Sequence, residues 1–163
     1  MYFGQKDSKY SDCLPIAVAN ACRFYGLSCP EPGTEAWEGI VDFTKCRHGS
    51  VIGGAEGIAE HFGLQAIPIP VAQAVGKIPV LLTVWNCEIG TSMHSVLIVG
   101  WQGDVATVVN YRFRSGPVVQ RVPLLLEKKP PMCPDGSHNM NIEWPGLYVP
   151  SPPNDDCYML EPR

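Results

Sequence analysis

Four separated positions of the chain carry residue types that could together perform thiol chemistry. Cys13 lies at the predicted start of a helix, directly after Asp12. A helix N-terminus presents unpaired backbone N–H groups and a partial positive charge, and both favour the thiolate over the thiol. Cys13 is therefore a candidate nucleophile, with packing in the core as the alternative.

A thiol nucleophile needs a base, usually histidine, and a group that orients this base. His94 opens the apolar run 94–101, and Asn110 follows the next such run. A hairpin turning at Gln102–Asp104 places the outer ends of the two runs side by side. We expect the Asn110 side-chain carbonyl to accept one imidazole N–H while the other ring nitrogen faces Cys13. Taken singly, His94 and Asn110 could each be a structural residue in a turn.

Gln5 precedes Cys13 by eight residues in a segment that we predict to be a loop. A glutamine amide beside a nucleophile can donate to the oxyanion that develops on the attacked carbonyl. The backbone N–H of Cys13 could be the second donor. The alternative for Gln5 is an ordinary surface position.

The helix that carries Cys13 is predicted over residues 13–25. Apolar residues recur along it at spacings of three and four, which indicates one buried stripe. Asp12 can cap its start, Pro15 is tolerated in the first turn, and Gly26 is a natural stop. Thr34 is expected to cap a second helix that ends at Cys46.

The second half of the chain has the patterns of strands. A short helix over 55–62 and an extended edge segment over 64–70 precede one helical turn at 71–76. The β-rich runs 78–86, 94–101, 105–113 and 117–125 predict an antiparallel sheet of about four strands. Residues 128–157 are rich in proline, glycine and asparagine and predict a long surface loop with a short strand at 146–150, and residues 157–162 are expected to close the sheet. We expect one α+β domain over 1–163.

Composition restricts the classes of function. Hydrophobic residues make up 45% of the 163 residues and charged residues 17%, as in a globular protein. The net charge of −4 gives no basic field for nucleic acid or an anionic membrane. The longest apolar stretches are too short to span a bilayer, and residues 1–12 lack a signal-peptide core. These features predict a cytoplasmic protein that binds neither nucleic acid nor membrane, with its seven cysteines mostly reduced.

Several short motifs occur in the order seen in one enzyme family. These motifs are Gln5, the pair DC at 12–13, FYG at 24–26, GKIPVLLTVW at 76–85, HSVLIVGW at 94–101 and VVN at 108–110. Over residues 3–113 the chain resembles the papain-like cysteine peptidases, in particular their C39-like branch. The sequence departs from the family pattern in two ways. Leu14 and Pro15 replace a small residue after the cysteine, and Tyr111 replaces a common proline.

The resemblance implies a papain-like fold, in which a helical half carrying the nucleophile helix packs on an antiparallel sheet. It implies that Cys13 is the nucleophile, His94 the base, Asn110 the orienting residue and Gln5 the oxyanion donor. The reaction would be cleavage of a peptide bond in a peptide or protein substrate through a thioester, without a cofactor. The same residues serve deamidases, transglutaminases and other acyltransferases, and an inactive peptide-binding module is a further alternative.

Other residue groups have simpler interpretations. Zinc ligands could be drawn from Cys22, Cys29, Cys46 and His48, or from Cys133, His138 and Cys157, but neither set has the paired short spacings of a zinc finger. Arg112, Arg114 and Arg121 are expected on a solvated face, or on a surface for an acidic partner. We therefore predict no metal site.

Overall fold

A computed structural model describes residues 1–8, 12–48, 51–86, 93–111, 116–126, 128–130 and 145–163. The α-helices in this part of the chain are α1 (Cys13–Tyr25), α2 (Glu35–Thr44) and α3 (Gly54–His61). Short 3-10 helices are η1 (Gln5–Asp7), η2 (Cys46–His48) and η3 (Val71–Gln73). Gln5 thus belongs to a helical turn rather than to a loop.

The strands form one mixed sheet. They are β1 (Leu64–Pro68), β2 (Val80–Trp85), β3 (Met93–Gln102), β4 (Val105–Val109), β5 (Val119–Leu125), β6 (Leu147–Tyr148) and β7 (Cys157–Pro162), in the order β1-β7-β2-β3-β4-β5-β6. The β5–β6 pair is parallel and the other pairs are antiparallel. The class is α+β as predicted. The four predicted runs form β2, β3, β4 and β5 and pair antiparallel, and β1, β6 and β7 enlarge the sheet to seven strands.

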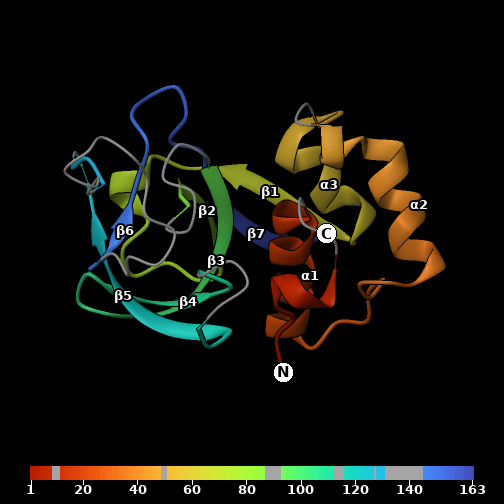
Figure 1. Ribbon diagram of the computed structural model, residues 1–163, viewed down its shortest axis with the longest axis horizontal. Helices are drawn as coiled ribbons and strands as arrows, with labels where there is room; N and C mark the ends of the chain where they lie inside the picture. Colours follow the sequence, from red (N-terminus) through yellow and green to blue (C-terminus); the bar gives the residue numbers. More distant parts are fainter. Residues whose placement is uncertain (9–11, 49–50, 87–92, 112–115, 127, 131–144) are drawn as a thin grey trace, which may run out of the picture.

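The helices and most of the sheet occupy two sides of the molecule. Figure 1 shows α1, α2 and α3 together on one side and strands β2–β6 on the other, with α1 between the sheet and the other helices. Successive side chains of a strand point to opposite faces of the sheet, so the core is divided into one cluster on the helical face and one on the other face. Leu81 and Leu97 pack with the helices, whereas Leu82 and Ile98 belong to a second cluster on the opposite face.

Local signals set the ends of the helices. Gly26 has a left-handed backbone (φ 70°) and ends α1, as its lack of a Cβ allows. The Thr34 hydroxyl accepts the Trp37 backbone N–H and caps α2 as predicted. α2 ends at Thr44, before the predicted Cys46, because Lys45 takes a left-handed conformation and η2 begins one residue later.

The C-terminal segment contributes more to the sheet than its sequence indicated. β7 lies between β1 and β2, so that it is an interior strand. Within the predicted loop 128–157, Leu147–Tyr148 forms the expected short strand, and residues 131–144 lie outside the described part of the chain. No described helix has both the length and the apolar character that crossing a membrane requires.

Candidate functional site

Cys13 and His94 meet where the start of α1 contacts β3. Cys13 is the first residue of α1, and α1 packs against β3, which carries His94 as its second residue. The His94 side chain is close enough to the Cys13 thiol to lower its pKa. The thiol also interacts with the backbone and the hydroxyl of Ser95, the next residue on β3. The structure therefore brings together the predicted nucleophile and the predicted base.

This environment favours the thiolate of Cys13. Burial raises the pKa of the thiol, because it penalises the charged form. The hydrogen bond and positive charge of His94 lower the pKa, and the hydrogen bonds of Ser95 lower it further. The favourable contacts outweigh burial, so that the Cys13 pKa lies below its ordinary value. Cys13 therefore has a larger thiolate fraction at neutral pH than an ordinary cysteine.

Asn110 holds His94 through its backbone. His94 is buried, and its Nε2 lies 2.6 Å from the Asn110 carbonyl oxygen. A carbonyl oxygen can only accept a hydrogen bond, so Nε2 carries a proton and Nδ1 is left to face the thiol. The predicted proximity of His94 and Asn110 is confirmed. The predicted contact through the Asn110 side chain was wrong.

The Asn110 side chain instead holds Gln5. The backbone N–H of Gln5 donates to Asn110 Oδ1 at 3.0 Å, and Asn110 Nδ2 donates to Gln5 Oε1 at 3.4 Å. Both residues are buried. Asn110 has a left-handed backbone (φ 62°), a conformation that asparagine tolerates better than most residues. This turn aims the carbonyl of Asn110 at His94 and its side chain at Gln5.

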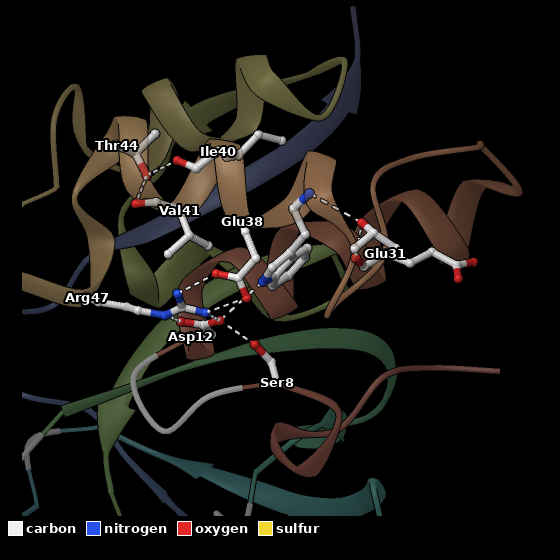
Figure 2. Close-up of polar contacts among 10 residues, drawn as sticks. Ser8, Asp12, Glu31, Glu38, Ile40, Val41, Thr44 and Arg47 are labelled. Atoms are coloured by element: carbon white, nitrogen blue, oxygen red, sulfur yellow. Dashed lines mark hydrogen bonds and ion pairs between the residues drawn. The ribbon is translucent and has the colours of Figure 1, made fainter.

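A partly buried ion pair anchors the residue before the nucleophile. Figure 2 shows the Arg47 guanidinium in a fork against the Asp12 carboxylate, with both nitrogen–oxygen distances at 2.6 Å. The Trp37 indole donates to the same carboxylate at 3.2 Å, and Ser8 is a further hydrogen-bond partner. Arg47 also contacts Glu38 at 2.7 Å. The start of α1 is thus tied to α2 and η2.

The role predicted for Asp12 therefore needs correction. Asp12 stands at the N-cap position, but its side chain makes no capping hydrogen bond. Burial raises the pKa of its carboxyl, and the hydrogen bonds of Arg47, Ser8 and Trp37 outweigh burial and lower it. The carboxylate is therefore charged, and the adjacent Arg47 reduces the repulsion that it would exert on a thiolate at Cys13.

A cleft of about 300 Å³ opens beside the thiol. Leu14 from α1 and Met93 and Ser95 from β3 lie on its wall, and these three residues flank Cys13 and His94 in sequence. Residues of α3, β2 and the start of β7 form the remaining wall. Neither Cys13 nor His94 lines this cleft, and it adjoins the thiol through Ser95, which interacts with Cys13.

The structure does not assemble the alternative metal sites from the residues that it describes. Cys13, Cys22, Cys29, Cys46 and Cys157 are free thiols. No group of three or more His, Cys, Asp or Glu side chains among the described residues is placed to hold a metal ion. Cys133, His138, Arg112 and Arg114 lie outside the described residues, and Arg121 is exposed.

Sequence reasoning missed Ser95 and Arg47. Ser95 is a polar residue inside an otherwise apolar strand, a signal that could have been noticed. Arg47 lies 35 residues from Asp12, and no local pattern indicates their pairing.

No protein-family model matches the chain, and neither a curated protein nor a solved structure matches it.

Proposed function

We propose that the protein is a thiol hydrolase of papain-like architecture that cleaves peptide bonds through a thioester on Cys13. The contact between Cys13 and His94 carries this proposal, because it lowers the pKa of a thiol at a helix N-terminus beside an open cleft. The division into a helical side and a sheet side, with α1 next to the sheet, supports the architecture.

The residues present account for each proton and charge of the reaction. The Cys13 sulfur attacks the substrate carbonyl, and His94 Nδ1 holds the proton that the thiol has lost. The carbonyl oxygen becomes an oxyanion, for which the Cys13 backbone N–H and the Gln5 side-chain amide are the proposed donors. His94 then protonates the leaving amine, and the acyl group remains as a thioester.

Release of the acyl group reverses the roles of the same residues. His94 removes a proton from water, and the resulting hydroxide attacks the thioester carbonyl. Expulsion of the Cys13 thiolate gives a carboxylic acid and regenerates the starting enzyme. Asn110 maintains the geometry throughout, since it holds both His94 and Gln5.

The first test compares the alkylation rates of the individual cysteines by iodoacetamide as a function of pH, using peptide mass spectrometry. We expect Cys13 to react first at pH 6, ahead of Cys157, whose pKa burial raises to about 12, and ahead of Cys22, whose pKa is also raised. An ordinary thiol is only about 0.3% ionised at pH 6, so His94→Ala should slow Cys13 by about one to two orders of magnitude. Equal rates for Cys13 in the two proteins would remove the basis of the proposal.

The second test measures cleavage of an internally quenched peptide library, with Cys13→Ala as the inactive control. Peptide cleavage that is lost in this variant supports a peptidase. Product that forms only when a primary amine is added would assign the same thioester to an acyltransferase instead. A reactive Cys13 with no turnover of either kind would contradict the proposed reaction.

A further inference from the structure

A row of polar side chains crosses three strands on the wall of the cleft beside Cys13. Ser95 of β3 is directly opposite Thr83 of β2. The Thr83 backbone N–H donates to the backbone carbonyl of Asp156, immediately before β7, at 3.0 Å. All three residues line the cleft. The row therefore starts at the residue that contacts the thiol and ends at a carboxylate.

The spacing of strands gives the length of this row. Neighbouring strands lie about 4.8 Å apart, so the backbone of Asp156 is about 10 Å from that of Ser95. A long substrate side chain and the side chain of Asp156 can together span this distance. The backbone of Asp156 is held by β2, whereas its side chain is exposed to the cleft and solvent.

A second acidic residue strengthens the negative charge at the same end of the cleft. Tyr158 lines the cleft two residues after Asp156, and Glu56 of α3 lies next to the lining residue Ala55 in sequence. Burial raises the pKa of Tyr158, and the negative charges of Glu56 and Asp156 raise it further. None of the described residues that line the cleft is basic.

Part of the wall of the cleft is apolar. Leu14, Val51, Ala55, Leu81 and Met93 form this part of its wall. An aliphatic chain with a positive charge at its end matches a wall that carries both apolar side chains and a carboxylate, because the methylene groups can stay in apolar contact while the charge meets the carboxylate. Lysine and arginine have this form.

We propose that the cleft selects a lysine or arginine side chain of the substrate, next to the scissile bond, and that Asp156 is the residue that determines this specificity. This inference rests on the proposed function. Asp156 is exposed, so its preference for a cation over a neutral side chain of the same length should be modest, about fivefold.

The experiment uses peptide chloromethyl ketones. A reactive thiolate attacks the chloromethyl carbon of such a reagent, chloride leaves, and a thioether forms. Acetyl-dipeptide reagents would carry lysine or the uncharged norleucine at the last or the penultimate position. The rate of Cys13 labelling by each reagent is measured by mass spectrometry. The expected result is a lysine-to-norleucine rate ratio of about five at one of the two positions.

Variants then assign the preference to the carboxylate. Asp156→Asn should bring the ratio close to one, and Asp156→Lys should make a glutamate reagent faster than the lysine reagent. Asp42→Asn is the matched control, because Asp42 is an exposed aspartate on α2 that does not line the cleft. It should leave the ratio unchanged.

The outcomes separate this inference from the proposed function. Rapid labelling of Cys13 with a ratio near one at both positions, or a ratio that Asp156→Asn leaves unchanged, overturns the specificity while the reactive thiol stands. Labelling of Cys13 that is no faster than that of Cys22 by every reagent overturns the proposed function, and the specificity with it.

Discussion

Replacement of Asn110 by glycine separates two ways in which this residue could orient His94. The sequence predicted that the Asn110 side chain accepts the imidazole N–H, whereas the structure assigns this role to the backbone carbonyl. Asn110→Gly removes the side chain and keeps the carbonyl. Glycine also adopts the left-handed conformation of this position (φ 62°) without strain. The substitution therefore removes one candidate contact and preserves the other.

The cost in stability follows from the contacts of the side chain. Asn110 makes two buried hydrogen bonds with Gln5, at 3.0 and 3.4 Å, and each contributes about 1 kcal/mol to the free energy of unfolding. Relief of the left-handed backbone returns up to about 1 kcal/mol. The net loss of about 1–2 kcal/mol corresponds to a fall in Tm of about 3–6 °C for a chain of this size. The variant should therefore remain folded at 25 °C.

The assay combines Cys13 alkylation at pH 6 with peptide hydrolysis. We expect Asn110→Gly to alkylate within about threefold of the wild type, because the Nε2 contact that positions the imidazole is retained. Hydrolysis should fall by about ten- to a hundredfold, because the Asn110 side chain no longer holds Gln5, whose amide is the proposed oxyanion donor. His94→Ala should lose both activities.

A second buried asparagine provides the matched control. Asn20 accepts the Phe3 backbone N–H at 2.8 Å and donates to the Phe3 carbonyl at 3.0 Å, so that it holds the same N-terminal segment at another point. Asn20→Ala should lower Tm by a similar amount and leave Cys13 alkylation unchanged. If Asn110→Gly is folded but its Cys13 alkylates as slowly as in His94→Ala, the backbone contact is insufficient and our account of the site is wrong.

Two further predictions concern the neighbours of the thiol. Arg47→Met should cost about 3–5 kcal/mol at pH 7, because it leaves the fully buried Asp12 carboxylate without its counter-ion, whereas Arg23→Met breaks an exposed pair and should cost at most about 1 kcal/mol. In the wild type, the pair stabilises the fold above the ordinary pKa of an aspartate, and this stability is lost as the pH falls through the lowered pKa of Asp12. In the variant, the unpaired Asp12 carboxylate protonates at a higher pH. The Arg47→Met deficit, measured by urea unfolding, should therefore shrink from pH 7 to pH 5, and a deficit that grows would contradict this. Gln5→Ala should reduce hydrolysis by about 10²–10³-fold without slowing Cys13 alkylation, and equal losses in both assays would show that Gln5 acts on the thiol rather than on the oxyanion.

Local patterns in the sequence determined the elements that carry the candidate site. The apolar stripe and Gly26 define α1, and the hairpin signal between the runs of β3 and β4 indicates that His94 and Asn110 are neighbours. These features depend on interactions among residues close in sequence, and such interactions leave recognisable patterns in the sequence itself. Cys13 could be placed at a helix start for the same reason.

Tertiary structure decided which atoms make the contacts. The choice between the backbone and the side chain of Asn110 depends on one left-handed φ angle and on Gln5, which is 105 residues away. Arg47 reaches Asp12 only because α2 and η2 fold back over the start of α1. The insertion of β7 between β1 and β2 carries Asp156 to the cleft. Contacts of this kind join segments that share no local pattern, and they exist only once the chain has packed.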